Sequence, residues 1–349
     1  MAYSTINKSG DYFNTVLYTG NGSARSITGV GFQPDWCWFK NRSTTNGHSI
    51  FDAVRGATKN IISNASAVES TSSNGLTAFA SDGFSVGTDG DVNGNGNNIV
   101  SWNWKANGQG SSNTDGTINT TYTSVNTTAG FSIVKYTGNG SNGATVGHGL
   151  GAVPEMMIIK EITGSGRNWR VYHKDMGNNY VMYLNTDSDR VSDATAFNST
   201  TPTSSVFSLG TSGGTNDNGN NYIAYCFAPK NGYSKFGSYT GNGNSNGPFI
   251  YTGFKPAFVL TKQFADQNDG WSLTDSVRDI AVAPNGARLL AQSTQAEQTN
   301  ETWALIEKYS NGFKIRGTDN VTNANGKNYL FMAFGQSIVG SNNIPATAR

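Results

Sequence analysis

The chain has 349 residues, enough for two or three domains, and its 24 Lys and Arg nearly balance its 23 Asp and Glu. A net charge of +1 gives no electrostatic reason to expect binding to nucleic acid or to an anionic membrane. Charged residues are 13% of the chain, about half the usual share for a globular domain. Gly, Asn, Ser and Thr replace them, while aromatic residues occur throughout, so we expect a folded β protein of secreted or virion type rather than a cytosolic enzyme.

The N-terminal stretch MAYSTINKSGDYF has neither an apolar run nor a basic leader, so we expect no signal peptide. No stretch of about 18 apolar residues occurs, so we expect no membrane-spanning helix. The expected product is made in a cytoplasm and leaves it, if at all, by assembly or lysis.

The pentad YTGNG begins at Tyr18, Tyr136 and Tyr239. Each Tyr ends an apolar, alternating run, and Gly and Asn tolerate the positive φ that tight turns need. The pentads are therefore predicted to be turns after strands; three identical ligand loops are the alternative. The spacing of about a hundred residues exceeds the period of solenoid and propeller repeats, which indicates duplicated whole domains.

A proline followed by an apolar run ending in Lys comes after each pentad: QPDWCWFK, VPEMMIIK and KPAFVLTK. In the first, Trp36 and Trp38 share one face, and Cys37 and Phe39 share the other. Runs that are apolar on both faces predict a central strand buried on both sides. Proline suits the first position of such a strand because it lacks a ladder donor.

The later segments of the copies also align. Copies one and three share the similar runs GHSIFDAVR and GWSLTDSVR, and copy two has the diverged run NWRVYHKDMG at the same place. The strands around Phe84, Phe207 and Phe313 are also equivalent. Each copy closes on a strand that is apolar at alternate positions, which predicts a face turned to the core. Those positions are Val100, Trp102 and Trp104, then Ile223, Tyr225 and Phe227, then Leu330, Met332 and Phe334.

Short strands with Gly/Asn-rich turns and almost no helical periodicity predict an all-β chain of three tandem, jelly-roll-like β-sandwich domains that arose by internal duplication. The predicted domains are 1–106, 107–231 and 232–349. The polar segment 107–130 is read as an edge hairpin with strands around 117–125, or else as a linker.

No Ser-His-Asp order, HExxH motif, CxxC motif or phosphate-binding loop occurs, and we predict no enzyme, no cofactor and no catalytic residue. The histidines His48, His148 and His173 stand in unmatched settings, and His48 aligns with Trp271, which favours a packing role.

Asp52, Asp175 and Asp275 align with one another in the three copies. Acid/base catalysis needs two carboxyl groups in one cleft, whereas these residues fall in three predicted domains. Arg55 and Arg278 follow two of them by three residues, so buried Asp–Arg pairs or turn caps are the preferred interpretation.

The run DGDVNG places Asp89, Asp91 and Asn93 like the first ligands of a calcium loop. The bidentate Glu expected at position 12 is replaced by Val100, so a polar turn explains the run equally well. We predict no metal site but leave calcium binding by these residues open.

The two cysteines, Cys37 and Cys226, lie in different copies and are expected to be buried free thiols, with a bridge as the alternative. Trp side chains can stack on carbohydrate, but Trp36, Trp38, Trp102 and Trp104 follow a core-like alternation and are predicted to be mostly core.

The segments YFNTVLYTGNG…SITGVGFQPDWCWFKNRST…HSIFDAVRG and SSNTDGTI…TTAGFSIVKYTGNGSNGATVGHGLGAVPEMMIIK…NWRVYHKDM resemble virion proteins of marine bacteriophages, notably cyanophages and pelagiphages. Those proteins carry repeated domains and are usually described as tail-fibre-like. The resemblance runs over nearly the whole chain and implies a particle component, but it supplies no catalytic residue. Unlike many tail fibres, this chain shows no anchor before the first repeat and no heptad shaft.

The expected function is therefore that of an exposed tail-fibre or appendage adhesin, with a capsid decoration or head-fibre protein as the alternative. The expected partners are other virion proteins and a host-surface glycan or protein, with no nucleic acid and no membrane. Viral appendages are usually cyclic oligomers, so a homotrimer is the first expectation. Binding residues are unknown; the length-variable segments 63–74, 185–205 and 292–300 are hypothesised to make the contacts, or else to be solvated connectors.

Overall fold

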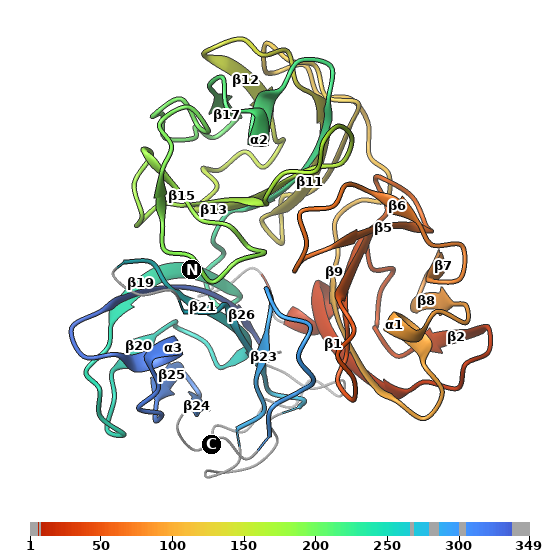
Figure 1. Cartoon of the computed structure of the whole chain (residues 1–349), viewed down its shortest axis with the longest axis vertical. Coiled ribbons are helices and arrows are strands. Elements are labelled where there is room, and N and C mark those ends of the chain that lie inside the picture. Colours follow the sequence, from red (N-terminus) through yellow and green to blue (C-terminus); the bar gives the residue numbers. More distant parts are fainter. Residues whose placement is uncertain (1–5, 7, 266–268, 279–285, 300–304, 337–349) are drawn as a thin grey trace.

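The chain forms three lobes of antiparallel β-sheet in the computed structural model, which describes residue 6 and residues 8–265, 269–278, 286–299 and 305–336 (Figure 1). The only helices among these residues are single turns. The all-β prediction is confirmed. No helix in the described part of the chain has the length and apolar character needed to cross a membrane.

Lobe 1 has a large sheet ordered β1-β9-β3-β4-β5-β6 and a small sheet ordered β2-β8-β7. The bounds are η1 (Ser9–Asp11), β1 (Phe13–Thr19), β2 (Arg25–Thr28), β3 (Trp36–Asn41), β4 (His48–Asp52), β5 (Lys59–Ile62), β6 (Ser70–Thr71), β7 (Leu76–Ala80), β8 (Gly83–Val86), α1 (Gly90–Asn93) and β9 (Asn98–Trp104).

Lobe 2 has a large sheet ordered β10-β11-β18-β13-β14 and the pairs β12-β17 and β15-β16. The bounds are β10 (Tyr122–Asn126), β11 (Phe131–Thr137), β12 (Ala144–Gly147), β13 (Met156–Glu161), β14 (Arg170–His173), β15 (Tyr180–Val181), β16 (Val191–Ser192), β17 (Val206–Leu209), α2 (Gly213–Asn216) and β18 (Asn221–Phe227).

Lobe 3 has a large sheet ordered β19-β26-β21-β22-β23 and a small sheet ordered β20-β25-β24. The bounds are β19 (Ser234–Thr240), β20 (Phe249–Tyr251), β21 (Pro256–Gln263), β22 (Ser272–Asp275), β23 (Leu289–Leu290), β24 (Ile306–Tyr309), β25 (Gly312–Ile315), α3 (Asn320–Asn323) and β26 (Asn328–Gly335).

Each lobe folds back on itself in the same way. Its first long strand pairs with its last, as β1 with β9, and its second pairs with the last strand but one, as β2 with β8. The same pairings recur as β11–β18 with β12–β17 and as β19–β26 with β20–β25. This nesting is typical of jelly rolls. One apolar cluster joins the large sheet of lobe 1 to its small sheet, with Cys37 and Phe39 packed against Ile27 and Phe84.

The opposite faces of the three large sheets pack against one another at the centre of the molecule (Figure 1). Equivalent residues of the closing strands meet there: Trp104 lies 5.6 Å from Phe334, and Phe227 lies 6.1 Å from Phe334, between ring centroids. Trp36 of lobe 1 stacks on Tyr225 of lobe 2 with centroids 4.6 Å apart. The large sheets are therefore buried on both faces, with a sandwich core on one side and a shared three-lobe core on the other.

The segment between lobes 1 and 2 contributes one strand to lobe 2. β10 forms a hairpin with the following strand β11 and makes the edge of that sheet, so the expected edge strand exists but its hairpin partner is β11 rather than another strand within 117–125. The predicted domain boundaries at 106/107 and 231/232 both fall between strands, after β9 and after β18.

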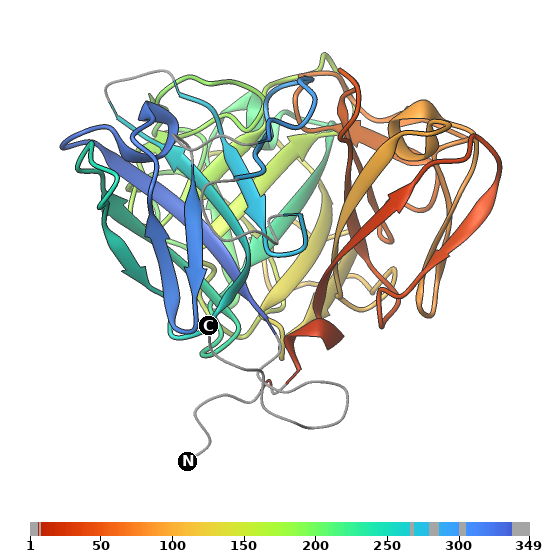
Figure 2. The same cartoon turned by 90° about the horizontal axis from the view of Figure 1, so that it is seen from below.

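The described chain begins and ends at the same end of this body. The Ser9 hydroxyl donates a 3.1 Å hydrogen bond to the carbonyl of Gln336. Figure 2 shows η1 at the lower end of the molecule and the turns α1 and α3 near the upper end. The contact between Ser9 and Gln336 therefore lies at the end of the body opposite to the turns that follow the first long strands.

Candidate functional site

The pairing registers show which residues occupy equivalent positions where the lobes meet. Asp52 pairs with Trp36 and Asp275 with Phe258, and the same place in lobe 2, opposite Met156, is held by His173. The sequence alignment put Asp175 there and was wrong by two residues, because the diverged loop of lobe 2 hides the register. The three equivalent side chains are two carboxylates and one imidazole, all buried.

Asp52 and Arg55 form a fully buried ion pair that also binds lobe 2. The Arg55 Nε lies 2.5 Å from Asp52 Oδ2, and the Arg55 backbone N–H donates to Oδ1 at 2.8 Å. The Tyr225 hydroxyl, from lobe 2, donates a 2.8 Å hydrogen bond to the same Oδ2. These donors satisfy the buried carboxylate oxygens of Asp52 and make the lobe 1–lobe 2 junction specific.

Asp275 and Arg278 repeat this arrangement between lobes 3 and 1. The Trp102 indole N–H donates to Asp275 Oδ2 at 2.9 Å, and the Arg278 guanidinium lies 5.2 Å from the Trp102 ring centroid. Burial would raise the pKa of Asp275, but the charge and hydrogen bonds of Arg278 outweigh burial and hold that pKa below its ordinary value. Both Asp–Arg pairs predicted from the sequence are confirmed as structural pairs.

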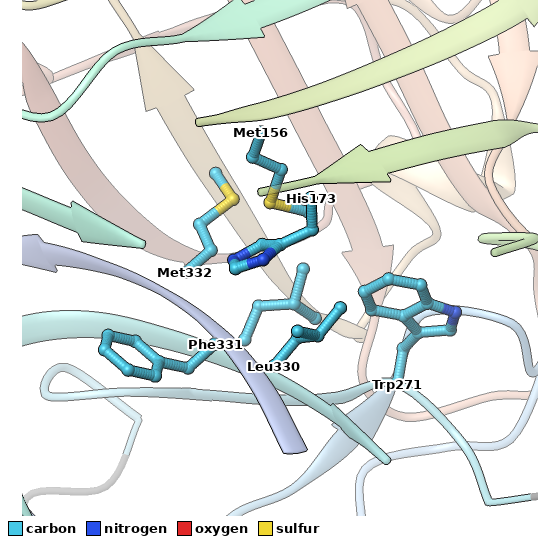
Figure 3. A pocket seen from close by; sticks show the side chains of 7 residues that line it. Met156, His173, Trp271, Leu330, Phe331 and Met332 are labelled. Atoms are coloured by element: carbon cyan, nitrogen blue, oxygen red, sulfur yellow. The ribbon is translucent and has the colours of Figure 1, made fainter. Parts of the chain in front are cut away.

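His173 stands at the third junction, between lobes 2 and 3, without such a pair. It faces Met332, the residue equivalent to Trp102 and Tyr225, and its Nδ1 accepts a 3.2 Å hydrogen bond from the Asp175 backbone N–H (Figure 3). Burial lowers the pKa of His173 to about 4, and Asp175 opposes that shift only in part. The gap that His173 lines with Met156 and Trp271 does not admit a water molecule, so it is a packing defect rather than a ligand pocket.

Three equivalent lysines cross the junctions near the end of the strand after each proline. Lys40 Nζ donates to Thr294 O at 3.0 Å, Lys160 Nζ to Ser66 O at 2.8 Å, and Lys262 Nζ to Asp187 O at 2.8 Å. Each acceptor belongs to a different lobe from its lysine. Burial lowers the pKa of each lysine to about 8.

The acceptors of these bonds lie in the length-variable segments that the sequence favoured for recognition. Glu297 also forms ion pairs with Arg42, at 2.5 Å, and with Arg278, at 2.8 Å. Parts of the segments 63–74, 185–205 and 292–300 are therefore used to hold the lobes together; Asn300 itself lies outside the described residues. The rest of each segment stays a candidate for outside contacts.

His48 occupies the packing position expected from its alignment. It is fully buried, accepts a 3.0 Å hydrogen bond at Nδ1 from the Trp38 indole, and burial lowers its pKa. The equivalent residues Trp169 and Trp271 donate across lobe boundaries, to Ile62 O at 3.1 Å and to Tyr183 O at 2.9 Å. His148, also buried, accepts from the Leu150 backbone N–H.

The pentads are turns, as predicted, and each is tied to the helical turn before the closing strand. The tyrosine hydroxyl of each pentad donates a hydrogen bond to a backbone carbonyl of that helical turn: Tyr18 to Val92, Tyr136 to Thr215 and Tyr239 to Thr322. The carboxamide of the last residue of each helical turn bonds the pentad from the other side, in Asn93, Asn216 and Asn323.

Both glycines of the pentad are required by geometry. A Cβ on Gly20 would lie 2.1 Å from the carbonyl oxygen of Gly94, and Gly22 has a φ of +67°. The same holds at Gly138 and Gly241, where a Cβ would meet a carbonyl oxygen at 2.4 and 2.5 Å. The triple repetition of YTGNG is thus explained by structure.

The calcium-like run forms the helical turn α1. Asp89 caps it by accepting from the Asp91 backbone N–H at 3.0 Å, and its other carboxylate oxygen accepts from Ser72 at 2.6 Å. The side-chain oxygen of Asn93 accepts a hydrogen bond from the backbone N–H of Asn21 in the pentad, at 3.1 Å. Within the described ranges no group of three or more His, Cys, Asp or Glu is placed to hold a metal ion.

The remaining predictions concern the core. Trp36, Trp38, Trp102 and Trp104 are all buried, and Cys37 and Cys226 are buried free thiols. Burial raises the pKa of Cys226 to about 12, which leaves the thiol unreactive at neutral pH. The cross-lobe hydrogen bonds from Tyr225 and Trp102 were missed from the sequence, since both residues read simply as inward-facing aromatics.

Residues 8–337 match the model of a family described as a domain of unknown function, DUF7483. The single match spans all three lobes. No curated protein and no solved structure showed a match to the chain. Because the family model covers far more than half of the sequence, the chain belongs to the DUF7483 family.

Proposed function

We propose that this protein is an exposed attachment module of a bacteriophage particle, acting as a tail-fibre or appendage adhesin. The observation that carries the proposal is its one-sided construction: Ser9 and Gln336 meet at one end, and the pentad turns lie toward the other. A rigid body held at one end presents its walls and far end to a partner. The resemblance to marine phage virion proteins supports the same function.

The chemistry of the junctions supports a structural rather than a catalytic role. The carboxylates of Asp52 and Asp275 are each fully buried and paired with an arginine, so neither is accessible to a substrate. We propose a protein without enzymatic activity, cofactor or metal, located on the exterior of the particle.

The arrangement of the lobes supports a particular assembly. In a trimer, three subunits would bury one face of each against the others. Here the large sheets of the three lobes of one chain already bury such faces against one another. We propose that one chain acts as a three-fold-like body by itself, in place of the homotrimer expected by analogy with viral appendages.

Capsid decoration is the second candidate, and the three-fold-like body favours it. The large sheets of the three lobes share the order of four central strands, β1-β9-β3-β4 in lobe 1, and a body with three such lobes matches a position where three capsid subunits meet. Such a protein would stabilise the shell by bridging neighbours.

Adding the purified chain to host cells before the phage distinguishes the two. An adhesin binds the cells and reduces phage adsorption in proportion to its concentration, whereas a decoration protein leaves adsorption unchanged. Gold-labelled antibodies against the chain locate it on the particle. Labelling of neither tail nor head would contradict both functions.

A further inference from the structure

The outer wall of lobe 3 carries two exposed aromatic side chains on one edge strand. Phe249 and Tyr251 of β20 are 45% and 55% exposed, while Ile250 between them is buried. Among the described residues no other Phe, Tyr or Trp stands out as an exposed large apolar side chain. β20 is the edge of the sheet β20-β25-β24 and lies on the outside of the molecule (Figure 1).

The fold does not require aromatic residues at these positions. The pairing registers place Ile250, Ile27 and Val146 at one equivalent position, each opposite a buried phenylalanine. The equivalents of Phe249 and Tyr251 are therefore Ser26 and Thr28 in lobe 1, and Thr145 and Gly147 in lobe 2. Two sister lobes form the same sandwich with small residues here, so packing does not explain the rings of lobe 3.

The aromatic rings lie beside a glycine of the neighbouring strand. The Phe249 ring lies over Gly312, where an added Cβ would come within 2.8 Å of it. Its centroid is 6.1 Å from that of half-buried Tyr309, with the rings at 67°. We call Phe249, Tyr251, Tyr309 and Gly312 the aromatic platform.

Cations surround the platform. Lys235 Nζ lies 5.2 Å from the Tyr251 ring centroid and donates to the Tyr251 carbonyl at 2.7 Å. Lys314, which pairs with Phe249 across the sheet, donates to the exposed side chain of Asn246 at 2.7 Å. Glu307, which pairs with Lys314 across the sheet, is bonded by Arg316 at 2.8 Å. Lys235, Lys314 and Arg316 together outweigh the charge of Glu307 among these described side chains, which makes the local potential positive.

We propose that the aromatic platform binds one or two sugar units of an acidic glycan. A pyranose ring has an apolar C–H face that stacks on an aromatic ring, while its hydroxyls and carboxylate meet Lys235, Lys314 and Asn246. Two exposed rings without a groove suit a ligand of this size, whereas a stable protein partner needs about 800 Å² on each side. The inference rests on the proposed attachment function and supplies its ligand class.

Calorimetric titration of the full-length protein with hexagalacturonate and with neutral cellohexaose tests the proposal. The matched variant carries Phe249→Ser and Tyr251→Thr, the residues that lobe 1 has at these places, and the control is Val153→Ser on an exposed site of lobe 2. We expect binding of hexagalacturonate at least about tenfold tighter than of cellohexaose. The platform variant loses this binding at an unchanged melting temperature, and the control keeps it.

Lys235→Gln combined with Lys314→Gln should remove the preference for the acidic probe. Failure of the wild type to bind hexagalacturonate, equal binding of both probes, or full binding by the platform variant overturns the proposal. Host-cell attachment distinguishes the glycan site from the broader attachment function. A platform variant that attaches as well as wild type contradicts only the glycan site. A wild-type chain that does not attach at all contradicts the adhesin function itself.

Discussion

Tyr225 of one lobe donates a 2.8 Å hydrogen bond to Asp52 of another, and that carboxylate is already paired with Arg55. The bond lies in the fully buried centre of the molecule, where an unpaired polar group is costly. It is one of several bonds that fix the relative placement of lobes 1 and 2.

Tyr225→Phe should therefore lower the free energy of unfolding by about 1–2 kcal/mol, because Asp52 loses one donor but keeps its arginine. Urea denaturation followed by tryptophan fluorescence measures the change. Tyr122→Phe, at a half-buried position of β10, is the control and should change little. A Tyr225→Phe protein as stable as wild type would mean that the hydrogen bond contributes nothing net.

Asp52→Asn should lower the free energy of unfolding by more, about 3–5 kcal/mol, because the buried Arg55 charge then keeps only its longer contact with Glu69, at 3.4 Å. Lobe 2 carries His173 and Met176 at the equivalent places, so the double change Asp52→His with Arg55→Met removes both charges together. The double variant should be more stable than Asp52→Asn. The reverse order, measured by the same denaturation, would show that the charge imbalance is not the cause.

The stability of the protein should depend on pH through His173. Its pKa is about 4 when folded and 6.5 ordinarily, so the unfolded chain binds the proton more tightly. The contribution of neutral His173 is thus fully present above pH 6.5 and is lost as the pH falls toward 4, by about 3 kcal/mol in all.

Comparing wild type with His173→Leu at each pH isolates this contribution from that of other acids. The difference in unfolding free energy between the two proteins should change between pH 6.5 and 4 and be flat above 7. A difference that stays constant over the whole range would show that His173 keeps an ordinary pKa.

Asn93→Ala should destabilise lobe 1 by about 2–3 kcal/mol, because two carbonyls and one N–H lose their partner together. Its side chain donates to Ser23 O and Gly87 O, both at 2.7 Å, and accepts from the Asn21 N–H at 3.1 Å. Exposed Asn95→Ala is the control. Hydrogen exchange of β1 and β9 reports the effect locally, and unchanged protection would contradict the role of the pentad as a tied turn.

Light scattering should give a monomer, near the chain mass of 37.1 kDa, at micromolar concentration. The physical reason is that the central faces of the lobes are already buried within one chain. A stable trimer in solution would show instead that the outer walls associate as well.

The sequence by itself determined the strands, the turns and the repeat. The alternation in segments such as Val100, Trp102 and Trp104 and the positive-φ demand of YTGNG are local properties, and both were readable before any fold was known. The burial of Cys37, the Asp52–Arg55 pair and the packing role of His48 also followed, because each depends on neighbours close in the chain.

Only the tertiary structure decided what the inward-facing aromatics meet. Period-two burial says that Trp102 and Tyr225 face a core, but it cannot say whether that core lies within a sandwich or between lobes. The hydrogen bonds from these residues to Asp275 and Asp52 join positions far apart in sequence, and a register error of two residues in lobe 2 hid His173. Exposure of Phe249 and Tyr251 likewise depends on the outward face of β20 being left uncovered, because the same alternation in a strand covered on both faces would have buried them.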